Sequence, residues 1–251
     1  MQGGRGSGRA GAGAVRLWGR HAVEAALLNP ERQHRKLWAT REGVASLDGE
    51  LPDDFPVEYA QPADLARLVA RDAPHQGLVL ECEPLPDVWL DDVMAGEADR
   101  PLIVLDQVTD PHNVGAIMRS ALAFNAAAII TQDRHAPVES GTLAKSASGA
   151  LEKLPWVRVV NLSRALEEMA EAGYWRIGLA GDAESDLASA LPAGPVALVL
   201  GAEGEGMRQN IRQHCDALAR LPISNAMESL NVSNAAAVAL YAAAARPILE
   251  D

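Results

Sequence analysis

The chain has 251 residues, enough for one large domain or two unequal ones, and 48% of them are hydrophobic although only 4% are aromatic. Its formal net charge of −12 argues against a protein that binds nucleic acid through overall positive charge. The two cysteines lie far apart, which disfavours a disulfide scaffold and a zinc site and favours a cytoplasmic protein. No apolar run reaches the roughly 18–20 residues that a transmembrane helix needs, which disfavours a membrane protein.

The first segment, residues 1–14, reads MQGGRGSGRAGAGA and predicts a disordered basic arm. It is either a solvated tail or an arm that touches nucleic acid, and its composition leaves both readings open. Residues 1–50 carry eight Lys or Arg against five Asp or Glu, so a polyanion is expected to meet this part of the chain.

Residues 15–83 predict a small α/β unit, and the acidic, proline-containing segment 84–100 predicts a linker. The elements expected in the unit are a strand running into a helix over 15–29, strands at 35–40, 57–60 and 77–83, and a helix at 62–70.

Residues 101–251 alternate between apolar runs and amphipathic segments, which predicts a parallel sheet covered by helices on both faces. The expected strands are 101–108, 126–132, 156–160, 175–181, 195–201 and 219–223. The expected helices are 113–124, 141–148, 162–172, 207–215 and an alanine-rich helix at the C-terminus.

Ligands of such sheets bind beyond the carboxyl ends of the strands, and three of these ends carry unusual residues. After strand 101–108 the chain reads TDPHNVGAIMRS, with Asn113 and Gly115 in the first turn of a helix and Arg119 further along. Alone this stretch is also compatible with a capped helix that bears one surface arginine.

After the strand at 195–201 the chain continues through GAEGEGMRQN. Its glycines allow a tight turn and a close approach of backbone to a ligand. Glu203 and Glu205 would repel a pyrophosphate, so the loop suits a ligand that has no phosphate and carries a positive charge. S-adenosylmethionine, with its sulfonium, is such a ligand.

The third strand end leads into AMESLNVSNAAAVALYAAAARPIL, where polar side chains crowd the entry to a very apolar helix. Helix capping explains one of them, but five polar residues in seven positions indicate a site. A serine nucleophile at Ser229 is disfavoured, because no G-x-S-x-G elbow surrounds it and no histidine follows it. The polar residues are Glu228, Ser229, Asn231, Ser233 and Asn234.

Together these stretches resemble the SpoU/TrmH family of RNA ribose methyltransferases. Its three motifs are similar to N-V-G-A-I-M-R (113–119), L-V-L-G-A-E-G-E-G-M (198–207) and L-P-I-S-N-A-M-E-S-L-N-V-S-N-A (221–235). Segments 145–155 and 158–164 resemble the group that methylates a guanosine ribose in large-subunit rRNA, and W-G-R-H-A-V-E-A-A-L (18–27) resembles the small RNA-binding domain of that group.

The resemblance implies the SPOUT fold, an α/β fold whose parallel sheet ends in a trefoil knot. It implies a catalytic domain over 101–251, preceded over 15–83 by a domain similar to ribosomal protein L30e. It further implies S-adenosyl-L-methionine as methyl donor, 23S rRNA as RNA partner, no metal, and a homodimer formed through the C-terminal helix.

The same match implies the site residues. The expected catalytic residues are Asn113, Arg119, Glu203, Ser229 and Asn231, with Arg119 clamping a phosphate and Glu203 orienting Arg119. The donor is expected on backbone groups of Leu200, Gly201, Leu221, Ile223 and Leu230. Two alternatives stay open: a tRNA ribose methyltransferase of the same family, and a noncatalytic RNA-binding module for ribosome assembly.

Overall fold

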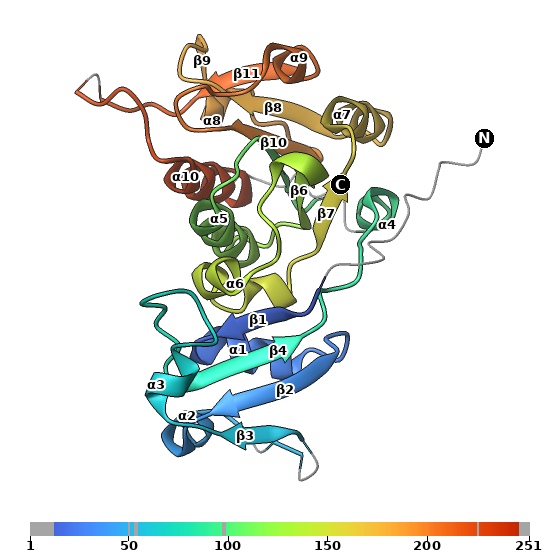
Figure 1. Cartoon of the computed structure of the whole chain (residues 1–251). Helices are drawn as coiled ribbons and strands as arrows, with labels where there is room; N and C mark the ends of the chain where they lie inside the picture. The colour runs from blue at the N-terminus through green and yellow to red at the C-terminus, as the bar shows by residue number, and fades with distance from the viewer. Residues whose placement is uncertain (1–12, 50, 53–54, 97–98, 225, 246–251) are drawn as a thin grey trace.

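The computed structural model describes residues 13–49, 51–52, 55–96, 99–224 and 226–245, so the predicted basic arm lies outside it except for residues 13–14. The chain forms a small sheet from its N-terminal part and a large sheet from the remainder (Figure 1). The helices α5 (Pro111–Ala123) and α6 (Gly141–Ala147) lie between the two sheets.

The small sheet has the strand order β1-β4-β2-β3. Strand β4 runs antiparallel to both β1 and β2, whereas β2 and β3 are parallel. The predicted helix over 62–70 is shorter, because α3 ends at Leu65. The elements are β1 (Val15–Trp18), α1 (Arg20–Leu28), β2 (His34–Ala39), α2 (Arg41–Ala45), β3 (Val57–Tyr59), α3 (Pro62–Leu65) and β4 (Leu78–Cys82).

The large sheet is parallel in every strand pair, in the order β7-β6-β5-β10-β8-β11-β9, which confirms the predicted parallel α/β sheet. Its strands are β5 (Leu102–Asp106), β6 (Ala128–Gln132), β7 (Trp156–Val159), β8 (Trp175–Leu179), β9 (Ser185–Asp186), β10 (Val196–Gly201) and β11 (Ala217–Arg220). The trefoil knot implied by the resemblance stays a prediction.

Helices cover both faces of this sheet, as the continuous apolar strands require. Along β5, Ile103 and Leu105 face a cluster that includes α5, α6 and α10. Their neighbours Leu102 and Val104 face a second cluster that includes α4 and α7. The covering elements are α4 (Leu90–Met94), α7 (Leu162–Glu171), α8 (Leu187–Ala190), α9 (Gln209–Arg212), α10 (Val232–Ala244) and two 3-10 turns (Asp133–His135 and Ala150–Glu152).

Two sequence-based elements differ in detail. The segment expected as a linker contains α4, whose Leu90 is buried in the second cluster. The helix expected over 207–215 is a single turn, because the residues before it belong to the glycine loop that follows β10.

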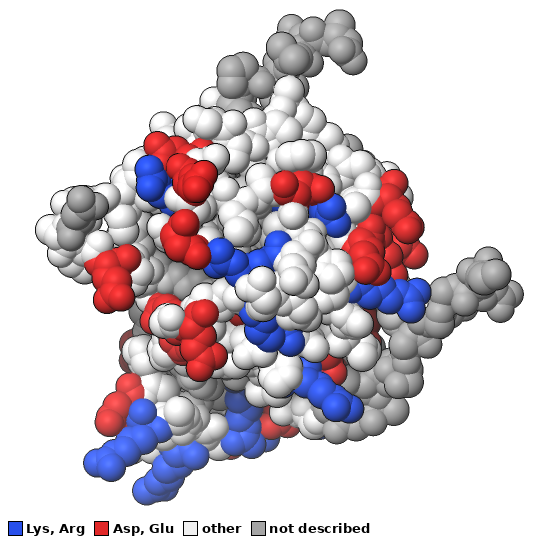
Figure 2. Space-filling view, turned by 90° about the horizontal axis from the view of Figure 1, so that it is seen from above, with Lys and Arg blue, Asp and Glu red and all other residues white. Residues whose placement is uncertain are grey.

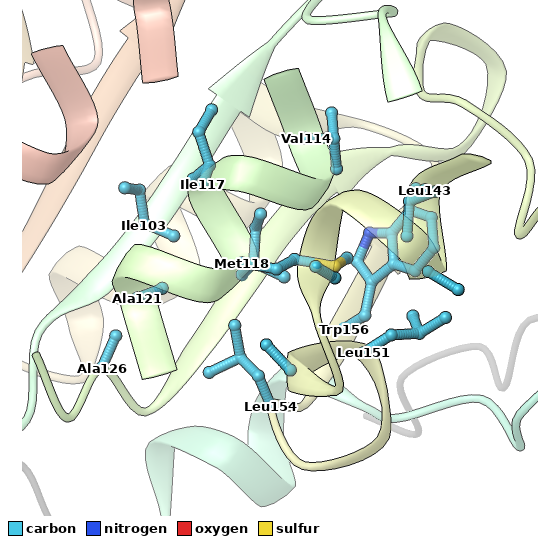
Figure 3. Packing of buried hydrophobic residues seen from close by; sticks show 14 of the residues in the cluster. Ile103, Val114, Ile117, Met118, Ala121, Ala126, Leu143, Leu151, Leu154 and Trp156 are labelled. Atoms are coloured by element: carbon cyan, nitrogen blue, oxygen red, sulfur yellow. The ribbon is translucent and has the colours of Figure 1, made fainter. Parts of the chain in front are cut away.

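The core between α5 and β7 is filled by large side chains from distant parts of the chain. Figure 3 shows Met118 of α5 pointing toward the indole ring of Trp156, with Leu143 and Leu154 beside them. The Trp156 indole nitrogen donates to the Thr131 hydroxyl at 2.9 Å, so its one polar atom is satisfied inside this core. The helix that carries Asn113 and Arg119 is therefore held on a rigid base.

The small sheet is joined to α6 through tight packing and buried charge. A Cβ atom at Gly141 would lie 2.0 Å from the ring of Trp18, so only glycine allows this approach. The guanidinium of Arg32 is fully buried and pairs with the carboxylates of Glu139 and Glu152, which come from the other side of the junction. These contacts fix how the two sheets are placed relative to each other.

The last helix, α10, packs its small residues against its own chain. Ala239 and Leu240 are fully buried, and α10 contacts α5 and β10. Val238 and Tyr241 are instead 47% and 61% exposed. The alanines therefore allow close packing inside the chain, and Val238 and Tyr241 lie on the exposed face of the helix. In the part of the chain that the structure describes, no helix is long and apolar enough to cross a membrane.

Candidate active site

Strands β5 and β10 lie next to each other in the sheet, but the chain leaves their shared edge in opposite directions. From β5 it proceeds through α5 to β6 on one side, whereas β8 and β11 lie on the other side of β10. A crevice forms at such a switch point, beyond the carboxyl ends of the strands. The loops singled out in the sequence follow β5, β10 and β11, so they meet here.

The centre of this region is the carboxylate of Glu203. Its Oε1 atom accepts hydrogen bonds from Asn113 Nδ2 at 3.1 Å, from Asn231 Nδ2 at 2.5 Å and from the backbone N–H of Val232 at 3.2 Å. Asn231 Nδ2 also donates to Asn113 Oδ1 at 3.1 Å. One residue from each of the three loops therefore joins a single polar cluster, which we call the Glu203 cluster (Asn113, Glu203 and Asn231).

Asn231 has a second task, because it is the N-cap residue of α10. Its Oδ1 accepts from the backbone N–H of Ser233 at 2.9 Å and from the Ser233 hydroxyl. The amide thus caps the helix with its oxygen and holds Glu203 with its nitrogen. The crowding of polar residues before α10 reflects both capping and the site.

A cleft of about 900 Å³ lies next to the cluster. All five residues expected to hold the methyl donor line it, together with Glu203 and Ser229. The donor residues are Leu200, Gly201, Leu221, Ile223 and Leu230.

The glycine loop gives the cleft its floor. A Cβ atom at Gly201 would lie 2.1 Å from the carbonyl carbon of Gly206 and from the nitrogen of Met207, so the loop returns directly over Gly201. Gly204 and Gly206 have φ angles of 80° and 69°, which favour glycine. The loop therefore presents main chain to the cleft.

Arg119 lies apart from these contacts. It is exposed on α5 and forms no hydrogen bond or ion pair with any residue that the structure describes. No contact between Glu203 and Arg119 is formed among the described residues, and one carboxylate oxygen of Glu203, Oε1, accepts from Asn113, Asn231 and Val232. That Glu203 orients Arg119 stays a prediction.

Other polar residues at the same edge were not singled out from the sequence. Asp106 is fully buried at the end of β5 and pairs with Arg208, and Asp182 and Asp186 line the cleft. Only the charge of Asp106 at the end of an apolar run could have suggested its role.

The lining of the cleft is acidic, with Asp182, Asp186, Glu203 and Glu228 contributing carboxylates. A hydrogen bond from Arg212 lowers the pKa of Asp182. Figure 2 shows basic and acidic side chains interspersed over the face of the molecule seen from above, without a broad basic field.

Comparison with known proteins identifies the family. The profile described as the SpoU rRNA Methylase family matches residues 100–241, more than half of the chain. The chain belongs to the SpoU rRNA methylase family. A second profile, described as RNA 2'-O ribose methyltransferase substrate binding, matches residues 16–88, the part that contains the small sheet.

Named members of this SpoU family are similar over most of the chain. The chain is 48% identical over 187 residues to the 23S rRNA (guanosine-2'-O-)-methyltransferase RlmB of Ralstonia nicotianae, covering 72% of this chain and 75% of that protein. It is 37% identical over 240 residues to the protein of the same name from Pseudomonas putida, covering 91% and 95%.

The fold is shared with a solved SpoU methyltransferase, AviRb from Streptomyces viridochromogenes in complex with the cofactor AdoMet. The TM-score is 0.76 at 25% sequence identity, and the match covers 92% of this chain and 89% of that one. The predicted family and SPOUT-type α/β fold are confirmed by these comparisons.

Proposed function

We propose that this protein transfers a methyl group from S-adenosyl-L-methionine to the ribose 2'-hydroxyl of a guanosine in 23S rRNA. The proposal rests on one observation: the Glu203 cluster lies beside a cleft lined by the glycine loop, and both lie at the switch point of the sheet. The names of the relatives at 48% and 37% identity supply the RNA and the nucleoside.

The cleft fits the methyl donor in size and chemistry. A volume of about 900 Å³ falls in the range of small-molecule sites, and the main chain around Gly201 can bind an adenine through amides and carbonyls. Carboxylates on the lining suit a cationic ligand and disfavour a phosphate. When bound, the donor supplies an electrophilic methyl group on a positively charged sulfur.

The protein's own residues orient the acceptor and stabilise charge. Ser229 on the cleft wall can hydrogen-bond an acceptor ribose, and Asn231 holds Glu203 and Asn113 beside it. Arg119 lies six residues after Asn113 on α5, about 9 Å along the helix axis, and has no carboxylate partner among the described residues. Its planar fork can therefore grip an RNA phosphate and stabilise the oxygen from which the proton leaves.

The RNA and subunit partners complete the proposal. Residues 15–83 act as the unit that recognises RNA, residues 84–100 connect it, and residues 101–251 carry the chemistry and a knotted C-terminal segment. The enzyme works in the cytoplasm as a homodimer. The exposed Val238 and Tyr241 on α10 support the homodimer, since neighbouring apolar groups on a helix surface favour contact with a partner subunit.

Mapping ribose methylation on 23S rRNA tests the function. Cells that lack the gene should lose one 2'-O-methylated guanosine, and the wild-type gene should restore it while an Arg119→Ala gene should not. Calorimetry on the purified protein should show binding of S-adenosylhomocysteine and none of NAD. An unchanged methylation map together with binding of NAD would refute the proposal.

A further inference from the structure

A buried carboxylate at the end of β5 is bound on several sides by one arginine. Asp106 is fully buried, and its oxygens accept from the Arg208 backbone N–H at 2.8 Å and from Arg208 Nε at 2.8 Å. Arg208 Nη2 lies 2.6 Å from Asp106 Oδ1. Such a pair is costly to break, because the buried charge would then lack compensation.

The network continues across the edge of the sheet. Arg208 Nη2 also donates to Gln132 Oε1 at 2.9 Å, at the end of β6. Gln132 Nε2 donates in turn to the carbonyl of Val160 at 3.1 Å, immediately after β7. Hydrogen bonds thus connect the carboxyl ends of three adjacent strands to the residue that follows the glycine loop.

The position of the network relative to that loop is specific. Asp106 pairs in register with Gly201 of β10, and Arg208 follows Met207, whose nitrogen lies over Gly201. The network therefore fixes both ends of the loop. Gly201, where the loop begins, is fixed by its pairing with Asp106, and Met207, where it ends, is fixed by its neighbour Arg208. Glu203, in the middle of the loop, is held separately by Asn113 and Asn231.

A comparable ion pair elsewhere in the sheet shows what a purely structural pair looks like. Asp216 accepts from the Arg176 backbone N–H at 2.8 Å, from Nε at 2.8 Å and from Nη2 at 2.6 Å. None of the four residues lines the cleft, but Arg176 is the second residue of β8, near the amino end of the strand, whereas Asp106 ends β5. The two pairs have similar hydrogen-bond distances and lie at opposite ends of the parallel strands, although Asp106 is fully buried and Asp216 is 23% exposed.

We propose that Asp106 and Arg208 are positioning residues for the methyl donor, which hold the main chain of Gly201 and Met207 at the spacing that the donor needs. The proposal rests on the proposed function of the cleft. It assigns neither residue a contact with RNA or with the transferred methyl group, because both act through the loop.

The test compares Asp106→Asn and Arg208→Lys with the control Arg176→Lys in the full-length protein. Asp106→Asn should weaken binding of S-adenosylhomocysteine by about tenfold or more, since a small displacement of a binding group has a large effect. Arg208→Lys keeps the charge and loses the fork, so it should have a smaller effect of the same kind. Arg176→Lys should lower the melting temperature without changing donor affinity.

Kinetics separate positioning from a general loss of structure. In Asp106→Asn the KM for the donor should rise while kcat at saturating donor stays within about twofold, because the Glu203 cluster keeps its own contacts. If Asp106→Asn does not fold, Gln132→Met removes only the distal link and should give a measurable rise in KM. Equal effects of Arg208→Lys and Arg176→Lys on donor affinity, or no effect of either, would overturn the proposal. A wild-type protein that binds no donor would instead refute the proposed function.

Discussion

Asn231 allows helix capping and site chemistry to be separated with one substitution. Asn231→Asp keeps an oxygen that can accept from the Ser233 N–H, and Asp caps helices about as well as Asn. It removes the amide nitrogen that donates to Glu203 and Asn113, and places a second carboxylate beside Glu203. We expect the fold to survive and methyl transfer to fall.

The size of the effect follows from these contacts. Loss of the cap in Asn231→Ala should cost about 1 kcal/mol of stability, whereas Asn231→Asp should keep that contribution. Two carboxylates about 4 Å apart repel by about 1 kcal/mol in water and about 4 kcal/mol near a protein surface. Glu203 is exposed, so screening puts the repulsion toward the lower value. If the displaced Glu203 cluster misplaces the acceptor, the rate should fall by about 10- to 100-fold.

Denaturant unfolding and single-turnover methyl transfer at saturating donor measure the two effects. The expected order of stability is wild type, then Asn231→Asp, then Asn231→Ala, while both variants transfer methyl slowly. An Asn231→Asp protein with normal transfer would show that the Glu203 cluster is only a helix-capping arrangement.

The structure supports four further predictions. Arg119→Ala should slow methyl transfer by about two to three orders of magnitude and leave thermal unfolding unchanged, because the side chain is exposed and has no partner among the described residues; normal turnover would place the key cation elsewhere. Arg32→Met should destabilise the protein by about 3–5 kcal/mol in denaturant unfolding, because it leaves two buried carboxylates without their cation. Val238→Glu should convert the proposed dimer to a monomer in sedimentation, and a dimer unchanged by the substitution would exclude this face of α10. Burial raises the pKa of the Cys82 thiol from 9.0 to about 12. The unfolded thiol therefore loses its proton first, and the free energy of unfolding should decline above about pH 9 by up to about 1.4 kcal/mol per pH unit. Between pH 8 and 10.5, Cys82→Val should lose less of its free energy of unfolding than the wild type does.

Much of the catalytic half could be predicted from local pattern. The run 101–108 is apolar at every position from Pro101 to Leu105, and it forms the interior strand β5 with both faces buried. The rule that ligands bind at the carboxyl ends of parallel strands predicts that three loops distant in sequence meet at one site. The Glu203 cluster is the physical result, since its members are up to 118 residues apart in the chain.

Pairings between distant side chains could not be predicted. Asp106 and Arg208 are separated by 102 residues, and the sequence does not state the strand order that makes them neighbours. The same holds for α10, because a stretch of eight alanines with Val238, Leu240 and Tyr241 (235–245) does not reveal which face packs on the rest of the chain. Ala239 proved to be buried within the subunit, and Val238 beside it is exposed. Nor could the sequence show that three donors from two other segments share one oxygen of Glu203.

The distribution of charge explains how so acidic a chain can serve as an RNA methyltransferase. Among the described residues that line the cleft, Glu203 and Glu228 have no basic partner, and Arg220 is committed to Asp186 at 2.9 Å. The cleft therefore carries uncompensated negative charge, which suits the cationic sulfur of the proposed donor, and transfer of the methyl group would remove that positive charge. In the proposed reaction, the same carboxylates would attract the donor, release its neutral product more readily and repel phosphate. Arg119 lies on α5 without a carboxylate partner among the described residues, so we propose that single arginines such as Arg119 contact the RNA in spite of the net charge of −12.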